Sequence, residues 1–192
     1  MDLKGKRIIL ASNSPRRKEL LSGLNIDFEI DTENYFEESF GPEVPYDEVP
    51  RRMAEGKSHG FHRPLEADEV LVTADTVVIV GEDVLGKPHS REEAVAMLRE
   101  LSGRAHEVVT GVTIRDPQHE KSFTNCTRVH FAALSPEQID YYVDRYRPYD
   151  KAGAYAIQEW IGYVAITGIE GSFYNVMGFP VDEVYRELHA FL

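Results

Sequence analysis

Short apolar runs alternate along this chain with segments in which apolar residues recur at helical spacing. The first pattern predicts buried or half-buried strands, and the second predicts helices with one apolar face. We expect strands at residues 7–11, 28–30, 69–80, 106–115, 122–133 and 162–169, and helices at 16–21, 49–60, 91–101, 136–145 and 180–192. Hairpins and helical crossovers both follow from this order. It favours an α/β fold with a mixed (parallel and antiparallel) twisted sheet and flanking helices, in two lobes around a cleft.

Several predicted helices begin with capping residues. Ser14 precedes Pro15, which fits the first position of a helix, and Gly23 fits the end of the same helix. Two further helix starts have the spacing of a capping box, Ser90 with Glu93 and Ser135 with Gln138.

The length and composition indicate an ordinary globular protein. The chain has 192 residues, 42% of them hydrophobic, and we expect a single domain over residues 1–192. Its mean hydropathy is −0.37, and no apolar run approaches the ~20 residues of a membrane span. The N-terminus lacks the apolar region of a secretory signal, and the single Cys126 cannot form an internal disulfide. We therefore expect a cytoplasmic protein without membrane contact.

The charges are unevenly placed along the chain. A formal net charge of −12 argues against binding to a long nucleic acid, because such binding depends on many phosphates neutralised by Lys and Arg. Residues 1–18 nevertheless hold six Lys or Arg and one Asp, a local charge of +5, which leaves −17 for the rest. A solvated basic terminus is the commoner meaning of such a cluster. A site for a small anion is the alternative.

The stretch SNSPRRK, residues 12–18, ends the first predicted strand and opens the first predicted helix. The unpaired N–H groups of a helix start attract anions, and here they lie among hydroxyl and guanidinium groups. The planar fork of arginine suits phosphate oxygens, so Arg16 and Arg17 are candidate phosphate ligands. The same letters also fit a plain surface helix start, and the motif is not a Walker A loop.

Asp75 places a carboxylate inside the apolar stretch VTADTVVIV. An unpaired charge there is costly, so we expect it to be stabilised by Mg²⁺, by a lysine such as Lys87, or by the field of a helix terminus. A carboxylate beside a metal can also deprotonate water. An Asp bonded to the backbone at a sheet edge is the plainer interpretation. Glu37 and Glu38, in the acidic segment after the second predicted strand, are either further oxygen ligands or solvated loop charges.

A third candidate segment is YDKAGAYAIQEWIG, residues 149–162. Its small residues at 152–154 allow a ligand or a neighbouring backbone to approach closely. Gln158 offers a paired donor and acceptor to the edge of a nucleobase, and Tyr155 could pack against a ring. A glycine-rich turn beside a core aromatic residue explains the same letters nearly as well.

An ordered series of motifs over nearly the whole chain resembles the Maf-like nucleoside triphosphate pyrophosphatases, small cytoplasmic enzymes once described as septum-formation inhibitors. The motifs are LASNSPRRKELL, MAEGKS, ADTVV, GKP, AVAMLRELSGRAHEVVTGV, DKAGAYAIQ and IEGSFYNVMGFP. The resemblance implies hydrolysis between the α- and β-phosphates of a nucleoside triphosphate, with Mg²⁺ or, as alternatives, Mn²⁺ or Co²⁺. It also implies a nucleotide-binding cleft between two lobes and a homodimer.

The resemblance further implies roles for individual residues. Asp75 would be the proton acceptor and, with Glu37, a metal ligand, and Lys87 would be a catalytic phosphate contact. The implied substrate-binding residues are Ser12, Ser14, Arg16, Arg17, Lys57, Thr76 and Gln158. Three of these resemble the specificity set of the branch that prefers dTTP and UTP, including modified uridine nucleotides: Arg16, Thr76 and Gln158.

One departure from the family pattern bears on the base preference. Glu159 and Trp160 follow Gln158 where the family often has a glycine, and these side chains would reshape the base pocket. Two other kinds of function stay open at this point. One is a regulator of cell division that senses nucleotide without turnover, and the other is an enzyme that removes only the terminal phosphate.

Overall fold

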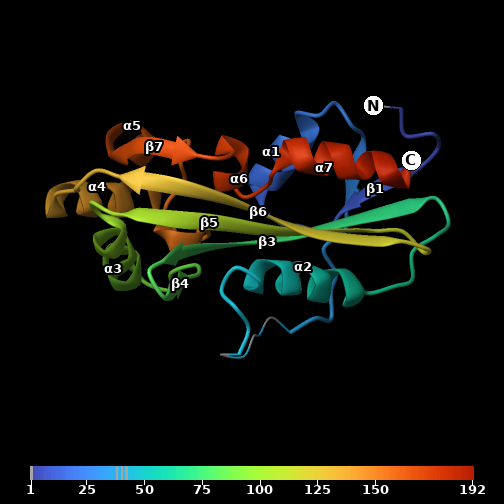
Figure 1. Ribbon diagram of the computed structural model, residues 1–192, viewed down its shortest axis with the longest axis horizontal. Coiled ribbons are helices and arrows are strands. Elements are labelled where there is room, and N and C mark those ends of the chain that lie inside the picture. The colour runs from blue at the N-terminus through green and yellow to red at the C-terminus, as the bar shows by residue number, and fades with distance from the viewer. Residues whose placement is uncertain (1, 38, 40, 42) are drawn as a thin grey trace. The chain divides into compact units, whose positions relative to one another are not determined.

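The computed structural model describes residues 2–37, 39, 41 and 43–192. Within these residues a seven-stranded mixed sheet is flanked by helices, so the predicted α/β class is confirmed (Figure 1). The strands are β1 (Arg7–Leu10), β2 (Phe28–Ile30), β3 (Glu69–Val80), β4 (Asp83–Leu85), β5 (Ala105–Arg115), β6 (Glu120–Phe131) and β7 (Ile166–Glu170). The helices are α1 (Pro15–Ser22), α2 (Val49–His59), α3 (Arg91–Leu101), α4 (Pro136–Tyr146), α5 (Trp160–Ala165), α6 (Phe173–Val176) and α7 (Val181–Leu188), with 3-10 turns η1 (Ala152–Ala154) and η2 (His189–Phe191). None of the helices in the described part of the chain has the length and apolar character that a membrane span requires.

The sheet runs in the order β2-β1-β3-β5-β6-β7, with β4 paired to β3. β1 pairs in parallel with both β2 and β3, which places Ile9 opposite Glu29 and Leu71. β4 pairs antiparallel with β3, and β7 pairs antiparallel with β6. Gly81 takes a positive φ of 63° in the turn between β3 and β4. The short strand β4 was not among the predicted elements.

The chain divides into two compact units, and strands β3, β5 and β6 contribute residues to both. Unit 1 comprises Met1–Asp75, Thr110–Asn125 and Gly178–Leu192, and unit 2 comprises Thr76–Val109 and Cys126–Met177. The single domain expected over the whole chain, and the cleft expected between two lobes, stay predictions.

In unit 1, helix α2 packs directly against the sheet. A Cβ atom at Gly111 of β5 would lie 2.3 Å from the backbone of Pro50 and Arg51, so this close approach requires glycine. The Thr73 hydroxyl of β3 donates a hydrogen bond to the carbonyl of Ala54 at 2.7 Å. Figure 1 shows α1 and α7 on the opposite side of the sheet from α2. In this unit the sheet therefore lies between α2 on one face and α1 and α7 on the other (Figure 1).

Helix α1 begins as its sequence predicts. Ser14 is the N-cap, and its hydroxyl accepts a hydrogen bond from the backbone N–H of Arg17 at 3.4 Å. Pro15 lies in the first turn, where its missing N–H costs nothing, and Gly23 follows the last residue of the helix. The N-cap therefore fixes how the chain turns from strand β1 into this helix.

The caps of α3 and α4 are confirmed, with one difference. Ser135 and Gln138 make both hydrogen bonds of a capping box. Ser90 accepts from the N–H of Glu93 at 3.1 Å, as predicted. The Glu93 carboxylate, however, accepts from the N–H of His89 at 2.6 Å, one residue before the N-cap. Both helices therefore start at the positions that their serines indicate.

The strand predicted at residues 162–169 is wrong over its first half. Residues 160–165 form helix α5, and strand β7 begins only at Ile166. The N–H of Gly162 donates to the carbonyl of Glu159 at 2.9 Å, and a Cβ at Gly162 would lie 1.8 Å from the carbonyl oxygen of Ile157. Glycine therefore allows a tight helical turn that the surrounding β-favouring residues do not signal. The predicted closing helix is also divided, into α7 and η2.

In unit 2, an aromatic cluster encloses His106. His106 lies on β5, is 2% exposed, and packs edge-on against the rings of Phe131 and Tyr155. Its Nε2 lies 2.7 Å from the Tyr155 hydroxyl. Burial lowers the pKa of His106 to about 4, because the charged ring would lack the hydration that it has in water. This histidine is therefore a neutral part of the core.

Candidate active site

The side chain of Arg17 holds the loop between β1 and α1. Its Nε donates to the carbonyl of Gly178 at 2.9 Å. Its Nη1 donates to the carbonyl of Ala74 at 2.9 Å and to the hydroxyl of Ser12 at 3.4 Å. Ser12 is 7% exposed. One guanidinium group in unit 1 thus joins the loop, strand β3 and the segment that precedes α7.

Asp75, at the edge of unit 1 on strand β3, is paired with Lys57 of helix α2. The Lys57 Nζ lies 2.7 Å from Asp75 Oδ1, and each side chain is 19% exposed. Residues 73 and 75 share a face of the strand, and residues 54 and 57 share a face of the helix, so the Thr73–Ala54 bond and this ion pair lie on one packing surface. The sequence suggested Lys87 as a lysine partner for Asp75, and the partner in the structure is Lys57.

The segment after β2 reaches the same end of α2 through two residues that sequence reasoning missed. Asn34 Nδ2 donates to the carbonyl of Lys57 at 2.6 Å, and Asn34 Oδ1 accepts from the N–H of Phe36 at 2.8 Å. A Cβ at Gly56 would lie 2.3 Å from the Phe36 ring, so ring and helix are in direct contact. No sequence pattern marks these residues.

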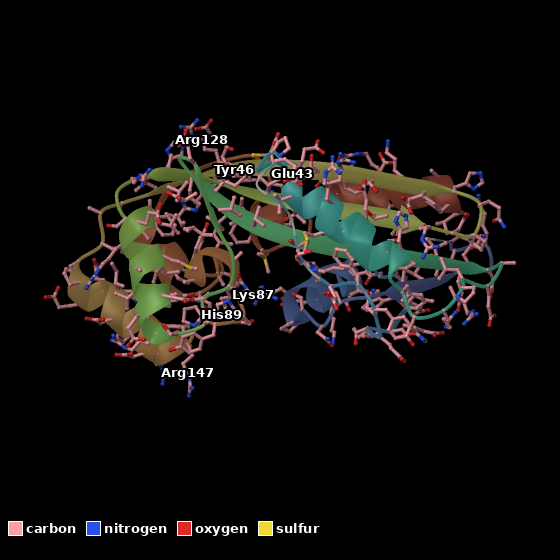
Figure 2. The ribbon with its side chains drawn as sticks, turned by 90° about the horizontal axis from the view of Figure 1, so that it is seen from below. Glu43, Tyr46, Lys87, His89, Arg128 and Arg147 are labelled. Atoms are coloured by element: carbon pink, nitrogen blue, oxygen red, sulfur yellow. The ribbon has the colours of Figure 1, made fainter. Side chains whose placement is uncertain are left out.

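The predicted metal carboxylate Glu37 follows Phe36 directly in this segment. Its side chain is exposed. The alternative carboxylate, Glu38, lies outside the described residues. Figure 2 shows Glu43 and Tyr46 farther along the same segment, before α2 begins. The contacts of Asn34 therefore fix the start of this acidic segment beside Lys57.

Two other predicted ligands lie at the start of α1. The hydroxyl of Ser14 serves as the helix cap, so it is committed to the backbone. Arg16 is half-buried in the first turn of the helix. Together with the Arg17 and Lys57 cations, Arg16 adds positive charge to a part of unit 1 that also holds the Asp75 carboxylate. Such a concentration of cations favours a polyanion.

In unit 2, the GKP and DKAGA motifs come together. Gly86, next to Lys87, accepts a hydrogen bond through its carbonyl from the N–H of Gly153 at 3.0 Å. Gly153 has a positive φ of 66°, and a Cβ there would lie 2.8 Å from the Val78 side chain, so two constraints require glycine. Lys87 is exposed on the loop between β4 and α3, as is His89 (Figure 2).

Of the predicted base-recognition residues, Gln158 is exposed and Thr76 is half-buried on β3. Tyr155 is buried against protein rings and bonded to His106, so the ring that it packs against belongs to the protein core. Burial raises the pKa of Tyr155 far above its ordinary value. The residue is thus a neutral core phenol.

Glu159 and Trp160 contact helix α4 and the segment after it. The Tyr142 hydroxyl donates to Glu159 Oε2, and Lys151 Nζ lies 3.5 Å from Glu159 Oε1. The Trp160 ring packs edge-on against Tyr141, with centroids 4.9 Å apart. Burial and the Glu159 carboxylate raise the pKa of Tyr142. The two residues that depart from the family pattern therefore take part in packing against helix α4 within unit 2.

The two predicted metal ligands, Asp75 and Glu37, both belong to unit 1. Among the described residues, no group of three or more His, Cys, Asp or Glu side chains is placed to hold a metal ion. Mg²⁺ in nucleotide sites is usually bound by one or two carboxylates together with substrate phosphates and waters. Asp75 and the exposed Glu37 have the carboxylate oxygens that Mg²⁺ prefers as ligands.

The mixed sheet with flanking helices makes this chain an α/β protein whose polar site lies at the ends of β1 and α2. A family model described as "Maf-like protein" matches residues 7–191, and the chain belongs to this family.

Curated relatives match over nearly their full length. A dTTP/UTP pyrophosphatase of Porphyromonas gingivalis is 52% identical, over 99% of this chain and 96% of its own. Proteins of the same name from Bacteroides thetaiotaomicron and Parabacteroides distasonis are 50% and 49% identical, over 95% and 99% of this chain and 94% and 98% of their own. A solved HAM1 protein of Coxiella burnetii has a TM-score of 0.43 and 15% identity, over 67% of this chain and 74% of its own.

Proposed function

We propose that this protein hydrolyses dTTP and UTP to the nucleoside monophosphate and pyrophosphate. Relatives about half identical over nearly the whole chain carry that activity in their names. The structural observation that supports the proposal is the Asp75–Lys57 ion pair, one residue along β3 from the carbonyl that Arg17 holds. This arrangement sets a carboxylate beside the loop and helix start to which the sequence assigns phosphate binding.

In this proposal Asp75 accepts the proton of the attacking water. The ion pair with Lys57 fixes the direction of the carboxylate, and a fixed base is more effective than a mobile one. Arg16 and Lys57 provide positive charge for phosphate oxygens, whose charge grows in the transition state. The roles of Thr76, Lys87 and Gln158 are those that the family resemblance implies.

A divalent metal, with Mg²⁺ as the first candidate, belongs to the same proposal. Asp75 would hold it, with Glu37 as the second carboxylate, and the ion would neutralise part of the charge on the phosphates. We expect a chelator to abolish turnover and added Mg²⁺ to restore it. Full activity in protein shown by elemental analysis to be metal-free, assayed in chelator, would contradict this part of the proposal.

The test of the reaction is product analysis on a panel of nucleoside triphosphates. Pyrophosphate and orthophosphate are measured separately for dTTP, UTP, CTP, GTP and ATP. We expect pyrophosphate in equal amount to the monophosphate, with dTTP and UTP turned over fastest. Orthophosphate and a diphosphate product would instead indicate removal of the terminal phosphate, and binding without either product would indicate a sensor.

The homodimer and the cytoplasmic location stay predictions. Light scattering at micromolar concentration tests the first, and fractionation of cells tests the second.

A further inference from the structure

The hydroxyl of Ser12 accepts two hydrogen bonds within the protein. One comes from the backbone N–H of Ser14 at 3.2 Å and the other from Nη1 of Arg17 at 3.4 Å. A serine hydroxyl has two lone pairs and one hydrogen. With both lone pairs directed at protein donors, the hydroxyl hydrogen is what Ser12 can offer to a ligand. Ser12 is thereby prepared to donate to an anion.

The guanidinium of Arg17 is at the same time engaged with the protein. Its Nε and Nη1 donate to two backbone carbonyls, those of Gly178 and Ala74, in addition to Ser12. Rigid, planar donors that bind three different groups hold the side chain in one orientation. These contacts use three of the five N–H donors of the guanidinium, and moving the group as a whole toward phosphate would break them, which is costly because both carbonyls are buried.

We propose that Arg17 is a positioning residue: it orients the Ser12 hydroxyl as a hydrogen-bond donor to a phosphate oxygen, and it fixes the loop against β3 beside Asp75. This assignment differs from the direct phosphate contact that the family resemblance implies for Arg17. The identity of the ligand, a polyphosphate chain, rests on the proposed function. In this loop, Ser12 is the residue that contacts the ligand.

The two roles of Arg17 differ in how its substitution combines with a change at Ser12. A direct ligand would lose the same factor in affinity whether or not Ser12 keeps its hydroxyl. If Arg17 acts through Ser12, substituting Arg17 would lower the affinity little once the Ser12 hydroxyl has been removed. The effects of substitutions within one hydrogen-bond network are not additive.

The experiment is a double-mutant cycle with Ser12→Ala and Arg17→Lys. The measured quantity is the dissociation constant of inorganic triphosphate by calorimetry, which needs no turnover. Arg17→Lys keeps the charge and loses the fork. We expect it to weaken binding about tenfold in the wild-type background and less than about twofold in the Ser12→Ala background, a coupling of ordinary size for contacting residues. Equal factors in both backgrounds would overturn the proposal.

Two controls separate positioning from general damage. Arg186→Lys makes the same exchange at an exposed, ion-paired arginine of α7, and we expect no change in binding. Should Arg17→Lys fail to fold, Arg17→Gln takes its place in the same cycle, and equal factors in the two backgrounds would again overturn the proposal. Ser12→Ala itself should lower triphosphate affinity about tenfold with an unchanged unfolding midpoint. Unchanged affinity of Ser12→Ala would overturn the proposal. A wild-type protein that binds triphosphate but turns over no nucleotide would contradict the proposed function and not this inference.

Discussion

Asp75 and His106 are both polar residues within strands rich in β-branched residues, and their surroundings in the structure are opposite in kind. Asp75 keeps 19% exposure and pairs with the ammonium of Lys57. His106 is 2% exposed and has a phenol for a partner, and burial lowers its pKa to about 4. The first residue is a charged group held in place near solvent, and the second is a neutral group inside the core.

The difference shows which kind of polar residue within an apolar strand is a candidate for catalysis. A carboxylate that keeps part of its hydration and has one counter-charge remains accessible to a ligand. A ring enclosed by Phe131 and Tyr155 contributes to packing and responds to pH only through unfolding. The kind of partner and the exposure therefore distinguish a candidate catalytic residue from a core residue.

Apart from substitution of Asp75 itself, the largest effect is expected from breaking the ion pair. Lys57→Met leaves the Asp75 carboxylate without its counter-charge, and we expect kcat/KM for dTTP to fall about 100-fold, equivalent to about 2.7 kcal/mol. Lys57→Arg, which keeps the positive charge, should recover part of this loss. Steady-state kinetics of the three proteins provides the comparison. Wild-type activity in Lys57→Met would show that Asp75 does not need this partner.

A smaller effect, on stability and not on turnover, is expected at His106. Its folded-state pKa of about 4 lies below the ordinary 6.5, so the unfolded chain binds the proton more tightly. The stabilisation is complete above about pH 6.5 and is lost as the pH falls toward 4. The loss at pH 5 is about 2 kcal/mol.

Urea unfolding at pH 7 and pH 5 measures this loss. His106→Gln, which retains a partner for Tyr155, should remove the corresponding pH dependence. The same exchange at exposed His89 should preserve it. An equal pH dependence in wild type and His106→Gln would contradict the assignment of a neutral core histidine.

The smallest effect is expected at Gln158, the exposed residue of unit 2 that the family resemblance assigns to base recognition. Gln158→Ala removes a paired donor and acceptor, and we expect the preference for UTP over CTP to fall about tenfold. Competition between the two nucleotides in one assay measures this ratio. An unchanged ratio would place base recognition elsewhere in the chain.

Local signals in the sequence were enough to predict much of the fold. Ser14, Ser90 and Ser135 cap helices because the capping bond joins residues two or three positions apart. Runs of apolar and alternating residues predicted β5 and β6; β6 has one face more exposed than the other, whereas β5 is buried on both faces from Val108 to Ile114. Helix α5 was missed because Gly162 is shaped by its approach to Ile157, which no spacing of apolar residues reveals.

The candidate site was predictable in its residue types and not in its pairings. Lys57 stands 18 positions before Asp75, and their contact depends on how α2 packs on β3. Gly178 accepts from Arg17 across 161 positions of the chain. Asn34 binds the carbonyl of Lys57, and a lone Asn in a loop has no pattern that would announce this. Long-range packing decides these contacts, so a sequence without its fold does not specify them.

The central claim is that Asp75 accepts the proton of water in a reaction that releases pyrophosphate. Pyrophosphate release from dTTP by Asp75→Asn and by the wild type, at equal protein concentration and saturating Mg²⁺, tests it directly. The account predicts a rate lowered about 10²- to 10⁴-fold in the variant, the range of general-base catalysis, with an unchanged unfolding midpoint. Pyrophosphate release at the wild-type rate from folded Asp75→Asn would contradict it.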